Sequence, residues 1–65
     1  MNEEQYKRAA EYVAMQCTGC SESPSILAAK GLKIMVEAYK QGKNPYCALN
    51  QYLGTDIEEN ILNVV

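Results

Sequence analysis

Glycine and proline positions divide this chain into segments of helical length. The boundaries are Gly19, Ser23-Pro24, Gly42, Asn44-Pro45 and Gly54. Proline has a fixed φ and no backbone N–H, so it suits the first position of a helix, and it keeps the preceding residue in the extended conformation that an N-cap needs. Glycine commonly ends a helix in the left-handed conformation. These boundaries predict a succession of helices.

Apolar residues recur at helical spacing within each segment. The first stripe consists of Tyr6, Ala9, Ala10, Val13 and Cys17. The second is wider and consists of Leu27, Ala28, Gly31, Leu32, Ile34, Met35, Ala38 and Tyr39. The spacing predicts helices over residues 3–17, 24–41, 45–53 and 56–63. We therefore expect an all-α fold, a small bundle of three to four helices that forms a single helical domain over residues 1–65.

Two local features predict how these helices pack and begin. Gly31 lies in the middle of the second stripe, where glycine costs about 1 kcal/mol relative to alanine. That cost is reasonable if another helix crosses there with close backbone contact. Thr55 and Glu58 fit a capping box, which predicts the start of the last helix. The expected apolar face of that helix consists of Ile57, Ile61, Val64 and Val65.

The charge pattern disfavours a general nucleic-acid binder. The chain has 65 residues and a formal net charge of −2, whereas such binders carry a basic footprint. A lysine row lies on the second predicted helix, near Tyr39 and Tyr46; it consists of Lys30, Lys33 and Lys40, with Lys43. A solvated helix side explains this row more simply. Weak nucleic-acid binding through it is the third function that we consider.

The cysteines form the one motif-like feature of the chain. Cys17 and Cys20 are two residues apart, and Cys47 is the remaining cysteine. A structural zinc site needs four ligands, but the chain has three cysteines and no histidine. Cys17 also ends a predicted helix, where the helix dipole opposes a reactive thiolate. We expect no metal and no cofactor, with small buried thiols and a partly exposed Cys47. A cysteine-dependent (zinc or thiol) regulatory protein using all three residues is the alternative function.

Catalytic chemistry has no recognisable residues in this sequence. The chain lacks histidine, a glycine-rich phosphate loop and a nucleophile motif. Its paired carboxylates, Glu3-Glu4 and Glu58-Glu59, lie in predicted first turns, where they compensate the helix dipole. We therefore predict no enzyme, no catalytic residue and no small-molecule substrate. A polar start after Met1 and the lack of a long apolar run predict a cytoplasmic protein that does not contact a membrane.

The leading expectation is a small non-enzymatic protein-interaction module, a regulator or phage-type inhibitor that binds a larger protein. Tyr12 and Met15 lie on the charged side of the first helix, and exposed aromatic and Met side chains are enriched at interfaces. With Arg8 and Val36, they are the predicted partner-binding residues. Because so short a chain has a thin core, we expect docking to another protein or to a second copy in a homodimer. Ile26 and Leu62 are expected to add apolar surface to that contact.

Overall fold

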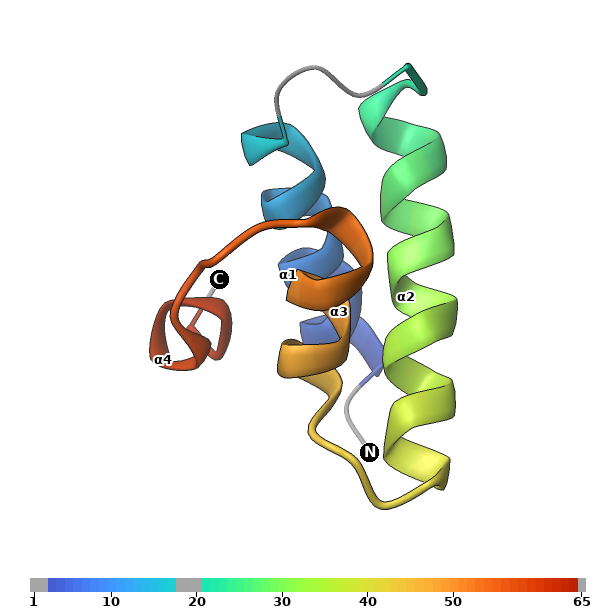
Figure 1. Cartoon of the computed structure of the whole chain (residues 1–65), viewed down its shortest axis with the longest axis vertical. Coiled ribbons are helices and arrows are strands. Elements are labelled where there is room, and N and C mark those ends of the chain that lie inside the picture. The colour runs from blue at the N-terminus through green and yellow to red at the C-terminus, as the bar shows by residue number, and fades with distance from the viewer. Residues whose placement is uncertain (1–2, 18–20, 65) are drawn as a thin grey trace.

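The computed structural model describes residues 3–17 and 21–64, and over these ranges it contains helices and no strand. The elements are α1 (Glu3–Gln16), α2 (Pro24–Lys40), α3 (Pro45–Leu53) and α4 (Glu59–Leu62). α1 and α2 form an antiparallel pair, α3 packs against both, and the short α4 lies beyond α1 and α3 from α2 (Figure 1). The predicted all-α bundle is confirmed. The expected helix stop at Gly19 lies outside the described residues.

The predicted boundaries of α2 and α3 follow their glycine and proline signals. Asn44 is extended, with φ −73° and ψ 115°, and its side-chain oxygen accepts hydrogen bonds from the backbone N–H of Tyr46 at 2.9 Å and of Cys47 at 3.2 Å. Gly42 and Gly54 both adopt positive φ, 77° and 67°, directly after these helices. Ser23 occupies the N-cap position of α2 in an extended conformation, although its side chain makes no capping hydrogen bond. Three of these four signals therefore act through the backbone alone.

Small residues allow α1, α2 and α3 to approach closely at Gly31. Ala9 and Ala10 of α1 are fully buried, and so is Leu49 of α3. A Cβ atom placed on Gly31 would lie 2.7 Å from the Leu49 Cδ1 atom and 3.4 Å from the Ala10 Cβ atom. The predicted crossing at Gly31 is confirmed, and two helices meet α2 there.

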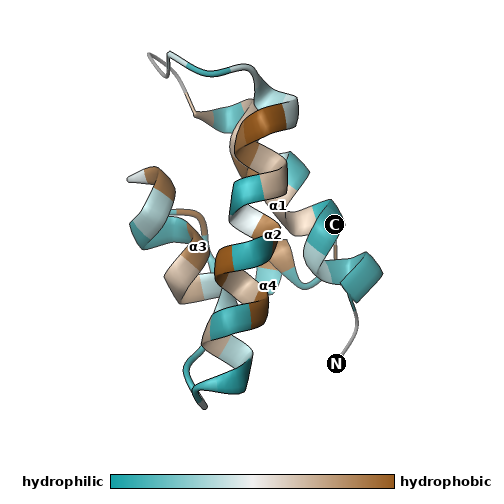
Figure 2. Cartoon of the chain, turned by 90° about the vertical axis from the view of Figure 1, so that its right-hand side faces the viewer, coloured by the Kyte–Doolittle hydropathy of each residue, from teal (hydrophilic) through white to brown (hydrophobic). Residues whose placement is uncertain are grey.

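The apolar stripe of α2 is wider than its neighbours cover. Its centre is buried against α1 and α3, but Leu32 and Ile34 on the two flanks are half-buried. Tyr39, expected in the same stripe, is 49% exposed. Viewed from the α2 side, hydrophobic and hydrophilic segments alternate along this helix (Figure 2). The apolar stripe of α2 thus has a buried centre and two partly exposed flanks.

The predicted start of the last helix is wrong. We expected a capping box at Thr55, but α4 begins at Glu59 with Glu58 as its N-cap. The Thr55 hydroxyl donates to the Asn50 side-chain oxygen at 2.7 Å, and the Asn50 amide nitrogen donates to the Ile57 carbonyl oxygen at 2.6 Å. Because the Asn50 side chain of α3 binds the Thr55 hydroxyl and the Ile57 carbonyl, residues 55–57 do not form the first turn of a helix.

Asn50→Ala is expected to lower the free energy of unfolding by about 1–2 kcal/mol, because it leaves the partly buried Ile57 carbonyl without its donor. Urea unfolding followed by circular dichroism measures this loss. Asn60→Ala, at an exposed position, is the matched control and should change little. Equal losses in the two variants would contradict the bridging role of Asn50.

The late start of α4 changes which apolar residues it buries. Leu62, expected on the surface, is fully buried in the core cluster. Ile61 and Val64, expected on the apolar face, are 41% and 84% exposed. Adjacent residues of a helix point about 100° apart, so Ile61 turns toward solvent when Leu62 faces the core. Ile57, which precedes α4, still packs against the core, and Val65 lies outside the described residues.

The exposed surface of the single chain has the size that is usual for its mass. It measures 4241 Å² for a chain of 7.2 kDa, close to the roughly 4100 Å² that the mass scaling gives for monomeric globular proteins. None of the helices within residues 3–17 and 21–64 is long and apolar enough to cross a bilayer.

Candidate functional site

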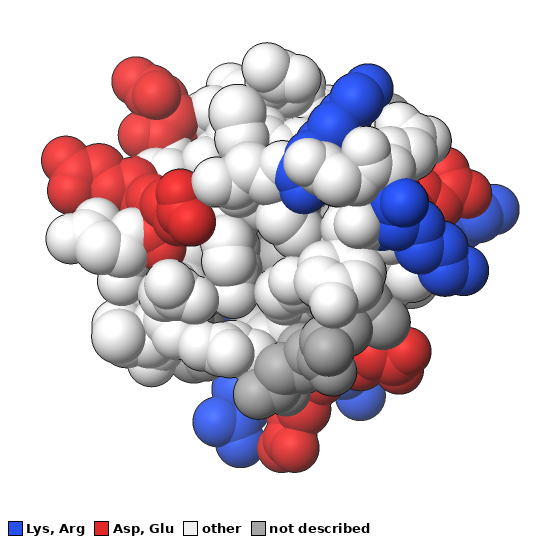
Figure 3. Space-filling model, turned by 90° about the horizontal axis from the view of Figure 1, so that it is seen from below, with Lys and Arg blue, Asp and Glu red and all other residues white. Residues whose placement is uncertain are grey.

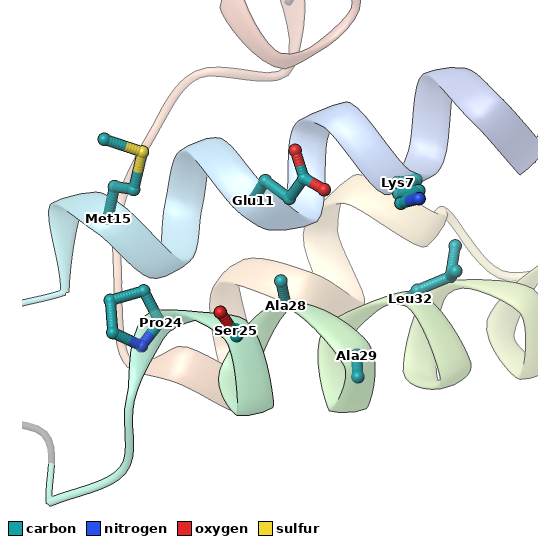
Figure 4. A pocket seen from close by; sticks show the side chains of 8 residues that line it. All are labelled: Lys7, Glu11, Met15, Pro24, Ser25, Ala28, Ala29 and Leu32. Atoms are coloured by element: carbon teal, nitrogen blue, oxygen red, sulfur yellow. The ribbon is translucent and has the colours of Figure 1, made fainter.

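A groove of about 400 Å³ runs between α1 and α2, on the side of this pair away from α3 (Figure 4). Its lining from α1 is Lys7, Glu11 and Met15. Its lining from α2 is Pro24, Ser25, Ala28, Ala29 and Leu32. α1 thus provides one rim with side chains one helical turn apart, and α2 provides a floor of mostly small residues.

The rim and the floor of this groove differ in chemistry. Met15 is 72% exposed, which is unusual for a large apolar side chain, and it lies over Pro24 at the opposite end of the groove from the half-buried Leu32 (Figure 4). Lys7 and Glu11, also exposed, place opposite charges along the rim. Ala28 and Ala29 leave the groove floor without bulky side chains. The arrangement suits an apolar side chain flanked by charged groups.

A second hollow, of about 420 Å³, continues the groove toward the N-terminal end of α1. The two share Ala29 and Leu32. The hollow is also lined by Glu3, Lys33, Val36, Glu37 and Lys40. Leu32 and Val36 are both half-buried and one turn apart on α2. This open flank of α2 is therefore an apolar strip with charges of both signs around it.

The structure distributes the predicted partner-binding residues over different environments. Met15 lines the groove and Val36 lines the second hollow. Arg8 is exposed, lines neither of them, and forms an ion pair with Glu4 at 3.2 Å. Ile26, expected to add apolar surface, is 49% exposed and also lies outside both.

The expectation that Tyr12 is exposed is wrong, because Tyr12 is half-buried and packs against the core cluster. The reason is that the C-terminal segment folds back along α1. Gln5 donates to the backbone carbonyl of Asn63, and the Cys17 Sγ atom lies 3.8 Å from the Leu53 carbonyl oxygen. Both ends of α1 thus contact residues that follow α3 or end it.

Sequence reasoning missed most of the groove. Neither Lys7 nor Glu11 was singled out as a contact residue from the sequence, and Leu32 was expected in the apolar stripe of α2. The signal that could have found the site is the width of the α2 stripe, because a stripe that broad exceeds what one neighbouring helix covers. Leu32 lies at the partly open edge of that stripe, and Ala29 and Val36, which lie outside the stripe, extend this edge along the groove and the second hollow.

The lysine row does not form a continuous basic face. The Lys30 ammonium donates to Glu22 at 2.8 Å, and this hydrogen bond raises the pKa of Lys30. Tyr46, expected beside the lysines, is buried and packs edge-on against Tyr6 with ring centroids 5.5 Å apart. Burial raises the pKa of the Tyr46 phenol. Viewed from the end near the α2–α3 connection, one edge carries acidic side chains alone, whereas acidic and basic side chains lie together at two other edges (Figure 3).

The cysteines differ from the expected buried thiols. Cys17 is half-buried and forms a disulfide bond, whereas Cys47 is a free, exposed thiol as expected. Cys20 lies outside the described residues. Within the described ranges, no three His, Cys, Asp or Glu side chains are grouped closely enough to hold a metal ion. The expectation of a simple apolar thiol at Cys17 is therefore wrong.

Comparisons of the chain with protein-family models, with curated proteins and with solved structures gave no match. The groove and its neighbouring hollow are therefore the features from which we infer a function.

Proposed function

We propose that this protein is a small protein-interaction module without enzymatic activity, and that the α1–α2 groove binds an α-helix of its partner. As a regulator or inhibitor, it would act by binding that helix. The observation that carries the proposal is the combination of an exposed Met15 with an open apolar floor on α2. Met side chains adapt to varied partner surfaces and are enriched at interfaces.

The shape of the groove favours a helical partner segment. It lies between two antiparallel helices, so its long direction follows their axes (Figure 4). An amphipathic helix laid in such a groove uses anchors three, four and seven residues apart. The lining residues Lys7, Glu11 and Met15 repeat at four-residue spacing on α1. The partner helix should therefore present apolar anchors with a basic and an acidic group one turn apart, to meet Glu11 and Lys7.

The burial pattern supports a binding role over a catalytic one. Catalytic acids and bases are usually tuned by burial and by close charged neighbours. Within residues 3–17 and 21–64, the buried set contains no polar or charged residue. The charged groups of the groove, Lys7 and Glu11, are exposed.

A photoreactive side chain tests this function. A benzoylphenylalanine at Ser25, which lines the groove, is expected to crosslink one discrete protein in an extract of the native source. The same group at Ser21, exposed but outside the groove, is the matched control and should not. Adding Ala29→Glu should reduce the Ser25 crosslink about ten-fold, because it places a charge on the apolar floor.

Identification of the crosslinked peptide decides the partner's chemistry. Mass spectrometry should map the link to a helix with apolar residues at four-residue spacing, and the synthetic helix should compete with the crosslink. Equal yields from Ser21 and Ser25, or a link to a non-helical segment, would overturn the proposal.

A thiol-dependent regulator is the second candidate, and the Cys17 disulfide favours it. The two functions differ in how the crosslink responds to reductant. A plain interaction module should give the same Ser25 yield with and without dithiothreitol, and with and without EDTA. A several-fold change with dithiothreitol would promote the thiol regulator, and a change with EDTA would promote the zinc form.

The predicted cytoplasmic location stays a prediction, and the disulfide argues against it because disulfides are rare in the cytosol.

A further inference from the structure

We propose that the helix bound in the groove is α1 of a second copy of this chain, paired about a twofold axis. This inference rests on the proposed function, since it names the partner of the same groove. Twofold pairing is the commonest form of self-association, and in a twofold dimer each contact between two different residues forms twice.

The charges on the rim of α1 are self-complementary. Lys7 and Glu11 are exposed, lie one turn apart and both line the groove. If a twofold axis crosses α1 midway between them, the two α1 helices run antiparallel. Lys7 of each copy then faces Glu11 of the other. Two opposite-charge contacts form from one pair of residues, and such contacts fix the register of an interface.

The same register gives the exposed Met15 a place to bind. Met15 and Glu3 lie equally far from the axis, about 9 Å along α1 on either side at 1.5 Å per residue. Met15 of one copy is therefore level with Glu3 of the other. Glu3 lines the second hollow together with Leu32 and Val36, so Met15 would enter a hollow with an apolar wall. Burial of the 72% exposed Met15 side chain would contribute to the association.

The chain itself contains a helix with the charge pattern that the groove favours, although this helix has a single exposed apolar anchor. α1 carries an acidic and a basic group one turn apart and an exposed apolar anchor one turn further on. The charge pairing and the Met15 position are independent observations, yet both are satisfied by one axis. A second copy is therefore the partner that these contacts select.

Charge-reversal variants test the register. Sedimentation equilibrium from micromolar to millimolar concentration should show a monomer–dimer equilibrium for the natural chain. Lys7→Glu and Glu11→Lys should each raise the dissociation constant about ten-fold or more, because each single change creates two like-charge contacts. Lys43→Glu, the same change of charge at an exposed position outside the groove and the second hollow, is the matched control and should leave the constant within about two-fold.

Mixing the two single variants separates this register from effects within one chain. A Lys7→Glu chain and a Glu11→Lys chain restore both opposite-charge contacts only when they pair with each other. The mixture should form a heterodimer with the affinity of the natural homodimer. Within each variant chain, residues 7 and 11 still carry charges of the same sign, so a recovery cannot come from a contact inside one helix.

Three outcomes would overturn the inference: a monomer at every concentration, a dimer that ignores Lys7→Glu, or single variants that do not recover on mixing. A monomer whose Ser25 crosslink still captures a different protein would remove the second copy and leave the proposed function standing. A dimer that is weakened by each charge reversal and restored on mixing, with Ser25 crosslinking to a second copy, supports both this inference and the proposed function.

Discussion

Gly31→Leu is expected to lower the free energy of unfolding by about 3 kcal/mol. The first carbon of the new side chain would lie 2.7 Å from Leu49 Cδ1 and 3.4 Å from Ala10 Cβ, and leucine adds three further carbons at this three-helix crossing. Because α1 and α3 both contact α2 at this point, neither helix can move away without losing its own packing. Urea unfolding followed by far-ultraviolet circular dichroism measures the loss, which should appear as a lower midpoint.

A double-variant comparison ties this effect to one contact. Gly31→Ala should also destabilise the fold, and Leu49→Ala should do so by leaving a cavity. Combined, the two should cost less than their separate losses added together, because the second removes the atom that the first meets. A Gly31→Leu protein that unfolds at the parent's urea midpoint would place the helix crossing elsewhere.

Leu62→Ala should produce a loss of similar size, about 3 kcal/mol, although Leu62 belongs to a helix of only 4 residues. Its side chain is fully buried among the core residues, so truncation removes contacts and leaves a cavity. The neighbouring Ile61 is 41% exposed, and Ile61→Ala should therefore cost less than about 1 kcal/mol. Thermal or urea unfolding of the two variants side by side measures the difference.

The contrast between these neighbours tests how the C-terminal segment is held. Leu62 is the apolar attachment of α4, and a hydrogen bond from the Asn44 amide to Glu59 at 2.8 Å is a polar one. Larger losses at Ile61 than at Leu62 would show that α4 presents the opposite face to the core. That is the face predicted from an earlier helix start.

These core positions are separate from the groove. Gly31 of α2 and Leu49 of α3 lie where α2 contacts α1 and α3. The groove lined by Lys7, Glu11 and Met15 is on the opposite side of the α1–α2 pair. Substitutions on the rim therefore change association without opening the core. The charge-swap experiment and the stability measurements can be interpreted independently for this reason.

Local chemistry was enough to predict where α2 and α3 begin and end. Asn44 can cap α3 because its acceptor is a few atoms from the N–H groups it binds. Gly54 can end α3 because glycine alone adopts the left-handed conformation at little cost. Gly31 also signalled its crossing, since a costly glycine in an apolar stripe needs a packing reason. Each of these signals acts within one residue or one turn.

Only the tertiary structure decided which faces are covered. Thr55 had two competing partners, the start of its own helix and the Asn50 side chain of α3, and the sequence does not say that α3 lies within reach. Tyr12 became half-buried and Leu62 fully buried because the C-terminal segment folds back onto α1. Leu32 and Val36 stayed partly open because α1 and α3 cover the centre of the α2 stripe and leave its flank. Spacing along the chain determines which residues share a face, whereas burial depends on the distant elements that reach that face, and these are set by packing of the whole bundle.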